Sequence, residues 1–275
     1  MEFSWIESII YGFVSGFAEF LPVSSEAHQQ LMLRLFGVNF VDPVRNLFIH
    51  IATFVAIYIN SRSFLEHTRR ERALPRRSKN YKSNSRLHFD YRFLKNAMIP
   101  MLVVFFVLRS IAKPDNNLLL CSVITLLNGV CLFLADRMVQ GNKDARIMSS
   151  IDSLFVGVAA GLSALPGFSR IGCAAVAASA RGAERRYCIN WALLLCIPAL
   201  IATIVLDIVH IFGGAGYPFW INLFSYIISA LTTYIGSYFS IRVLRYISIK
   251  SGFSTFAYYS LGLSILLFVL YLIVV

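Results

Sequence analysis

The sequence is poor in charge. Charged residues make up 14% of its 275 residues, whereas a typical soluble domain has about 25%. Hydrophobic residues make up 57%, and the mean hydropathy is +0.68. This composition argues against a soluble protein and favours a single helical membrane domain, residues 1–275. No small-residue cleavage site follows the acidic Glu2 and Glu7, so we expect no signal peptide.

The sequence also lacks the cysteine spacing of a metal or disulfide scaffold. Its five cysteines lie in or beside apolar segments, and no two form a CxxC pair. Acidic residues are scarce too, with 14 against 25 lysines and arginines, which leaves a net charge of +11. The basic residues cluster between hydrophobic segments, as in membrane topology signals. We therefore expect a bilayer, and no nucleic acid, as the partner of these charges.

Apolar residues form six segments long enough, or nearly so, to cross a hydrocarbon core of roughly 30 Å. They lie near 46–60, 96–112, 117–135, 189–212, 219–241 and 254–275. Two other segments, roughly 3–36 and 152–180, are interrupted by glycine, proline and polar residues. The sequence predicts an all-α integral membrane bundle with two broken helix–loop–helix segments.

The distribution of basic residues orients this bundle. Residues 61–95 hold eleven lysines and arginines against three acids, so we expect a cytoplasmic loop there. The basic residues beyond 136 fall on the same side only if 152–180 enters and leaves the membrane on one side. The charges therefore favour a re-entrant segment at 152–180, and the predicted fold has two re-entrant helix–loop–helix segments, one at each break.

The two broken segments resemble each other. The stretch GFVSGFAEFLPVSS at 12–25 matches GVAAGLSALPGFS at 157–169 with one deletion. The predicted topology inserts them in opposite directions, so we predict an inverted repeat with halves near 1–137 and 150–275. Such repeats place a site where their discontinuous helices meet. The GxxxG glycines by themselves predict only close helix packing.

Ionisable residues at membrane depth are costly, so each is a candidate functional residue. The candidates are Glu19, Ser24, Ser25, Glu26 and His28 at the first break, and Ser169 and Arg170 at the second. If the breaks meet, an arginine beside helix N-termini and hydroxyls suits a phosphate or diphosphate. Serine and histidine offer a nucleophile or general base, and a carboxylate can orient the histidine or hold a divalent ion.

The polar residues after Pro22 also have a structural interpretation. Ser24 and Ser25 can simply cap the next helix. Glu26 is better explained as a favourable acid in the first turn of that helix than as a catalyst.

Other candidates have structural alternatives as well. Arg170 can be a counter-ion of Glu19. His50 is a lone histidine on an apolar helix, and we expect a satisfied packing residue. Asp207 and Asn190 also lie in apolar segments and are expected to line the cavity.

The motifs EFLPVSSEAH (19–28) and LPGFSRIG (165–172), followed by LLLCIPALIATIVLD (193–207), carry a family resemblance. The chain resembles, over nearly its whole length, the bacterial undecaprenyl-diphosphate phosphatases of the bacitracin-resistance type. The resemblance implies a multi-pass enzyme of the bacterial inner membrane with inverted repeats and re-entrant helices. Its reaction would convert undecaprenyl diphosphate to the monophosphate at the extracytoplasmic face, recycling the lipid carrier for peptidoglycan biosynthesis.

Site residues follow from the resemblance by position. It implies Glu19, Ser25, His28 and Arg170 as catalytic residues, and Ser24, Ser169, Gly167 and Gly172 as substrate-binding residues. The nucleophile, Ser25 or His28, stays open. Glu19 is also the expected ligand of a divalent cation, Mg²⁺ or Ca²⁺, because hard ions suit oxygen ligands beside a diphosphate.

The chain departs from the family pattern at three positions. Ser15 stands where an acidic or amide residue is common, Ile171 where a serine follows the arginine, and Asn190 where a glutamate is common. The alternative function is therefore a transporter, flippase or binding protein for a polyprenyl phosphate or another anionic lipid, with catalysis lost. A structural scaffold does not explain Glu19 and Arg170. A homodimer stays open.

Overall fold

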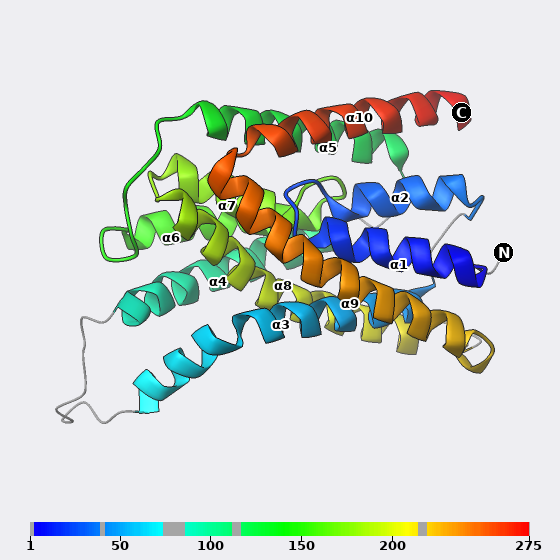
Figure 1. The fold of residues 1–275 in the computed structure, drawn as a ribbon, viewed down its shortest axis with the longest axis horizontal. Coiled ribbons are helices and arrows are strands. Elements are labelled where there is room, and N and C mark those ends of the chain that lie inside the picture. The colour runs from blue at the N-terminus through cyan, green and yellow to red at the C-terminus, as the bar shows by residue number, and fades with distance from the viewer. Residues whose placement is uncertain (1–2, 39–41, 74–85, 112–116, 214–218, 275) are drawn as a thin grey trace.

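The computed structural model describes residues 3–38, 42–73, 86–111, 117–213 and 219–274. Every element named in these ranges is a helix, and the helices form one bundle (Figure 1). They are α1 (Trp5–Glu19), α2 (Ser25–Leu35), α3 (Pro43–Ala73), α4 (Arg86–Ile111), α5 (Leu118–Arg137), α6 (Ser150–Gly161), η1 (Leu162–Ala164), α7 (Arg170–Ala180), α8 (Arg185–Gly213), α9 (Phe219–Lys250) and α10 (Ser254–Val274).

Six of these helices are long and apolar enough to cross a membrane, namely α3, α4, α5, α8, α9 and α10. They confirm the six apolar segments predicted from the sequence, and the chain is a multi-pass, all-helical membrane protein. Helices α1, α2, α6 and α7 have between 11 and 15 residues, whereas a crossing needs about 20. The re-entrant path of these short helices and the inverted repeat stay predictions.

The loop predicted for the basic segment 61–95 is shorter in the structure. Helix α3 continues to Ala73 and α4 begins at Arg86, so the expected loop is wrong at both ends, and residues 74–85 lie outside the described residues. Lysine, arginine and glutamate are good helix formers, and Arg62 pairs with Glu66 one turn later at 2.6 Å. The charged residues therefore mark where the helix leaves the apolar part of the membrane, but the helix itself continues beyond that point.

Glycines let the short helices approach the long ones closely. Helix α1 packs along α9, and a Cβ at Gly16 would lie 2.1 Å from the Thr233 carbonyl oxygen. Helix α6 packs along α4, where a Cβ at Gly157 would lie 2.2 Å from the Ala97 carbonyl oxygen. The GxxxG pairs are confirmed as packing residues.

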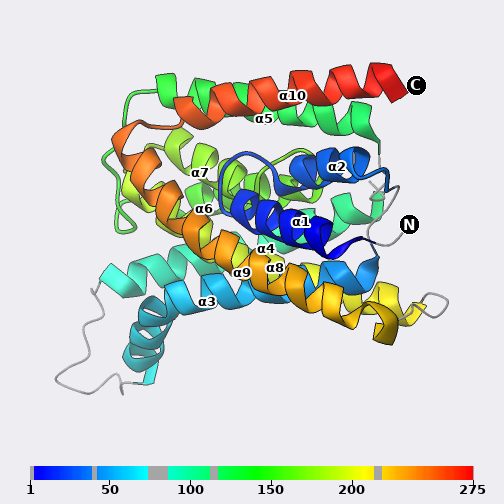
Figure 2. The same cartoon turned by 45° about the vertical axis from the view of Figure 1, so that its right-hand side comes forward.

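The remaining helices close the bundle around α8. Trp191 and Leu200 of α8 are almost fully buried and belong to the largest apolar cluster. Helices α5 and α10 lie side by side along one edge of the bundle in both views (Figures 1 and 2). The short α1–α2 and α6–α7 pairs thus pack against long helices on one side, and α1 and α6 each leave an apolar face exposed.

Gly16→Ala is expected to destabilise the fold by about 1–3 kcal/mol, because the added methyl group overlaps the α9 backbone. Thermal unfolding of the detergent-solubilised protein measures the change. The matched control is Gly262→Ala in α10, where an added Cβ has no atom within 4 Å. An unchanged melting temperature for Gly16→Ala would contradict the close approach of α1 and α9.

Candidate active site

The first break lies between α1 and α2. Glu19 is the last residue of α1, and Pro22, which has no N–H to donate, lies in the turn. Ser24 caps α2 by accepting a hydrogen bond from the Ala27 N–H at 3.2 Å. Its φ of +64° is the one positive value for a non-glycine residue in the described ranges, a strain of about 1–3 kcal/mol that the surrounding contacts maintain.

The second break lies between α6 and α7. Gly167 adopts a φ of +109°, and a Cβ there would lie 2.7 Å from the Cys121 carbonyl oxygen of α5. Ser169 caps α7 by accepting from the Gly172 N–H at 3.1 Å, and its hydroxyl donates to the Leu21 carbonyl at 2.9 Å. Gly167 thus packs against α5, while Ser169 connects the two breaks.

Asn128 of α5 joins both breaks and was not predicted from the sequence. Its Nδ2 donates to the Pro22 carbonyl oxygen at 3.0 Å, and its Oδ1 accepts from the Ser169 N–H at 3.1 Å. The residue is 2% exposed. The available signal was a lone amide in an apolar segment, which resembles the pattern of Asn190 and does not reveal a partner.

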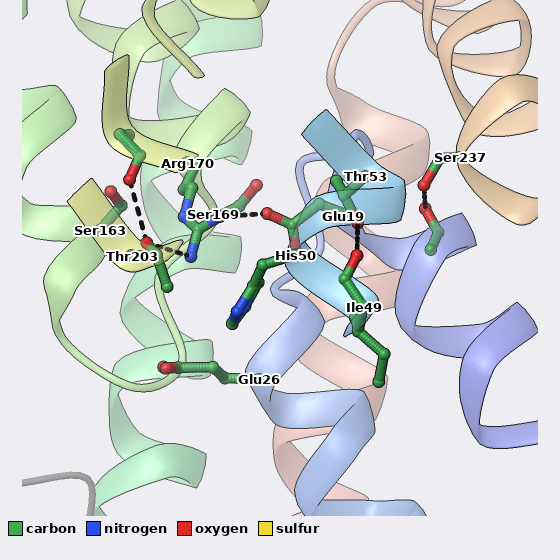
Figure 3. Close-up of polar contacts among 12 residues, drawn as sticks. Glu19, Glu26, Ile49, His50, Thr53, Ser163, Ser169, Arg170, Thr203 and Ser237 are labelled. Atoms are coloured by element: carbon green, nitrogen blue, oxygen red, sulfur yellow. Dashed lines mark hydrogen bonds and ion pairs between the residues drawn. The ribbon is translucent and has the colours of Figure 1, made fainter. Parts of the chain in front are cut away.

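The two breaks place Glu19 and Arg170 in contact. Arg170 Nη1 donates to Glu19 Oε1 at 2.5 Å, as Figure 3 shows. The side chains are 14% and 6% exposed, so the ion pair is largely shielded from solvent. Arg170 Nη2 also reaches Thr203 Oγ1 at 3.4 Å, which leaves further guanidinium N–H groups for a ligand.

A cavity of about 250 Å³ lies beside this ion pair. Ser25 and Glu26 from the first turn of α2, and Arg170 from the first turn of α7, line it together. Arg109 of α4 lies on its wall and donates to Glu26 at 3.3 Å. Two helix N-termini and two arginines therefore face one space and can bind an anion there, although the carboxylates of Glu26 and Asp207 line the same cavity.

His28 is directed elsewhere and does not line this cavity. Its Nδ1 lies 2.7 Å from the Ser24 carbonyl oxygen and its Nε2 lies 2.7 Å from the Tyr259 hydroxyl of α10. Because a carbonyl only accepts, Nδ1 carries the hydrogen, and in the neutral ring Nε2 accepts from Tyr259. Gly172, near Asn128, is also outside the cavity lining. Of the four predicted catalytic residues, Ser25 and Arg170 line the cavity. Glu19 contacts Arg170 but is not among the lining residues, and His28 is not either.

The cavity wall holds a different histidine, His50. The Nδ1 atom of His50 lies 2.6 Å from Asp207 Oδ2, so the ring is hydrogen-bonded as expected, but it lines the cavity instead of only packing against apolar neighbours. Asp207 is confirmed as a cavity residue. Asn190 instead lines a second cavity, of about 520 Å³, with Asp90 and Arg245. A lone histidine in an apolar segment does not show which face it lies on.

The residues that the structure describes contain no preformed group of metal ligands. No three or more of their His, Cys, Asp and Glu side chains are grouped closely enough to hold a metal. Glu19, the expected ligand, is occupied by Arg170. Mg²⁺ is often bound by only one or two carboxylates together with substrate phosphates, so the prediction of Mg²⁺ or Ca²⁺ stays untested.

Comparison of the sequence with known proteins identifies a family. The family model for bacitracin resistance protein BacA matches residues 8–266. The chain belongs to this family. BacA-type relatives named undecaprenyl-diphosphatase come from Carboxydothermus hydrogenoformans, with 27% identity over 94% of this chain and 95% of the relative, and from Thermosipho melanesiensis, with 29% identity over 95% and 98%. Undecaprenyl-diphosphatase 3 of Bacillus cereus is 27% identical over 97% of each chain.

Replacing the amide that joins the breaks tests this part of the BacA-type site. Asn128→Leu keeps a similar volume but leaves the Pro22 carbonyl and the Ser169 N–H without this partner. We expect the free energy of unfolding to fall by about 1–3 kcal/mol for each unsatisfied group, which thermal unfolding measures as a lower melting temperature. Leu127→Ala, on the exposed face of the same helix, is the control and should change the melting temperature far less. Equal effects would contradict the bridging role of Asn128.

Proposed function

We propose that this protein hydrolyses undecaprenyl diphosphate, or a similar polyprenyl diphosphate, to the monophosphate and inorganic phosphate. Membership of the BacA family and relatives named undecaprenyl-diphosphatase support this reaction. The reaction recycles a lipid carrier for the cell wall. The partners are then the lipid substrate and the bilayer.

The observation that carries the proposal is the position of Arg170 at the N-terminus of α7, inside a cavity that the N-terminus of α2 also faces. Guanidinium groups bind phosphate oxygens through paired hydrogen bonds. The free N–H groups of a first helical turn add donors for the same anion. Together they would hold the terminal phosphate and stabilise the charge that develops on it during attack.

The cavity is large enough for only one part of the proposed substrate. Sites for whole drug-sized ligands occupy about 300–1,000 Å³, and this cavity of about 250 Å³ is smaller. It fits a diphosphate headgroup rather than a polyprenyl chain. The isoprenoid tail would therefore leave the cavity between helices and lie against lipid.

Helix packing supports an inverted repeat. If the first five helices correspond in order to α6–α10 of the second half, α1 corresponds to α6 and α4 to α9. The contact of α1 with α9 then has its counterpart in the contact of α6 with α4, and both contacts are present. We propose on this basis that α1–α2 and α6–α7 enter the membrane from opposite sides.

The cavity is proposed to open on the extracytoplasmic side of the bacterial inner membrane. Its walls come from the start of α3 and the ends of α4 and α8, including His50, Arg109 and Asp207. Of the basic segment 61–95, residues 61–73 form the end of α3 and residues 86–95 the start of α4, at the opposite end of the bundle from these walls (Figure 1). The positive-inside rule assigns that end to the cytoplasm.

Phosphate release from undecaprenyl diphosphate by the purified protein tests the function. We expect release by the natural protein, and a loss of about 100- to 1,000-fold in kcat/KM for Arg170→Lys, because lysine keeps the charge but not the planar donors. Arg62→Ala is the control, since Arg62 is 70% exposed and pairs with an exposed glutamate. The assay is run with Mg²⁺, with Ca²⁺ and with a chelator, which tests the predicted cation.

The same assay separates the enzyme from a lipid carrier. A protein that binds the lipid but releases no phosphate under any divalent ion would contradict hydrolysis and favour the transporter or flippase. Release that is unaffected by Arg170→Lys would leave the reaction in place and contradict the proposed phosphate site.

Cysteine labelling in cells tests the orientation. Leu35→Cys at the end of α2 and Val139→Cys after α5 introduce thiols at positions that are 62% and 93% exposed. In a background where Cys131, the one exposed native cysteine, is replaced by serine, Leu35→Cys should react with an impermeant reagent from outside. Val139→Cys should react only after permeabilisation. The opposite result would place the cavity on the cytoplasmic side.

A further inference from the structure

His50 and Asp207 form a hydrogen-bonded pair on the cavity wall. They belong to α3 and α8, and His50 Nδ1 lies 2.6 Å from Asp207 Oδ2. Their side chains are 14% and 12% exposed, so the pair is mostly shielded while still lining the cavity. Two helices that are far apart in the sequence thus place an imidazole against a carboxylate beside the phosphate site.

The hydrogen bond fixes the chemistry of the ring. A carboxylate accepts hydrogen bonds, so Nδ1 of His50 carries the hydrogen that it shares with Asp207. Nε2 of the neutral ring then has a free lone pair. An aspartate that holds a histidine in this tautomer, and stabilises the imidazolium formed when the ring takes a proton, is the arrangement that activates bases in hydrolases.

The ring has access to the place where phosphate would bind. Figure 3 shows the His50 side chain directed into the space between Arg170 and Glu26. All three residues line the same cavity. The other titratable groups of the cavity wall are Tyr11 from α1, Glu26 from α2, Arg109 from α4, Arg170 from α7, and Asp207 and His210 from α8.

His28 does not offer an equivalent group. Both of its ring nitrogens have partners, the Ser24 carbonyl oxygen and the Tyr259 hydroxyl. Using it as a base at the cavity would require the ring to leave both partners. His50 needs no such rearrangement, because only Nδ1 is taken up by Asp207.

We propose that His50 is the general base of this phosphatase, with Asp207 as its positioning residue, an inference that rests on the proposed function. A water molecule at Nε2 gives its proton to His50 while its oxygen bonds to the terminal phosphorus. The bond from that phosphorus to the bridging oxygen breaks, and its electron pair stays on the polyprenyl monophosphate. The proton then passes from His50 to solvent or to the departing phosphate.

Replacement of His50 tests the base directly. His50→Ala should lower kcat by about 100- to 10,000-fold, the usual contribution of general acid–base catalysis, with KM little changed because the phosphate-binding groups stay in place. Added imidazole should restore part of the rate, in proportion to the concentration of its neutral form. A structural role for His50 predicts no such rescue. A normal kcat in His50→Ala, or a lowered kcat that imidazole does not restore, would overturn the proposal.

Two variants of Asp207 separate positioning from folding. Asp207→Asn retains the shape but can hold the ring in the other tautomer, so kcat should fall while KM stays near its natural value. Asp207→Glu restores the carboxylate and should recover part of the loss in kcat. Equal losses in both variants, with a raised KM or a lowered melting temperature, would contradict a positioning role.

The controls keep this inference distinct from the proposed function. Ile51→Ala lies on the exposed face of α3 next to His50 and should keep full activity. If the natural protein releases no phosphate, the proposed function fails. If it is active and His50→Ala retains its kcat, the function stands and the base assignment fails. Imidazole rescue of His28→Ala, but not of His50→Ala, would return the base to the position implied by the family resemblance.

Discussion

The ion pair between Arg170 and Glu19 is the contact on which the rest of the site depends. Each charge stands at the unfavourable end of its helix, with Glu19 at the C-terminus of α1 and Arg170 at the N-terminus of α7. Each is also largely buried, so neither charge is tolerable without the other or another counter-ion. The two helix breaks must therefore meet, and an anion at the N-terminus of α7 would relieve the electrostatic conflict there.

The surrounding structure holds the breaks in this position. Asn128 and Ser169 connect the two turns through backbone groups that lipid cannot satisfy. Gly16 and Gly157 let the short helices settle against α9 and α4. The strained backbone at Ser24 is held by its own hydrogen bonds, from the Ala27 N–H to its hydroxyl and from His28 to its carbonyl. Packing and polar satisfaction thus act together, and neither alone would fix two short helices inside a membrane bundle.

Composition and charge were enough to predict the class of fold, the six long helices and the two breaks, because each of these features depends on a short continuous stretch of sequence. Glu19 and Arg170 could be paired because a repeated motif linked two distant segments. The partners of Asn128 and His50 could not be predicted, because each is a single polar residue in an apolar helix. Which residue such a side chain contacts depends on how its helix is rotated against the neighbouring helices. The end of α3 and the start of α4 were placed wrongly because hydropathy predicts only the part of a helix that lies in the hydrocarbon core. Helix propensity, which stays high in charged residues, determines how far the helix continues.

The three departures from the family pattern lie outside the lining of the phosphate cavity. Ile171 is fully buried in the apolar core, and Asn190 lines the second cavity. Ser15 is one turn before Glu19, and its hydroxyl is buried without a hydrogen-bond partner. A carboxylate at Ser15 would add a second negative charge beside Glu19 and call for a cation. With serine there, Arg170 is the one described cation paired with Glu19, and its remaining N–H groups, together with Arg109 and the helix N-termini, face the diphosphate.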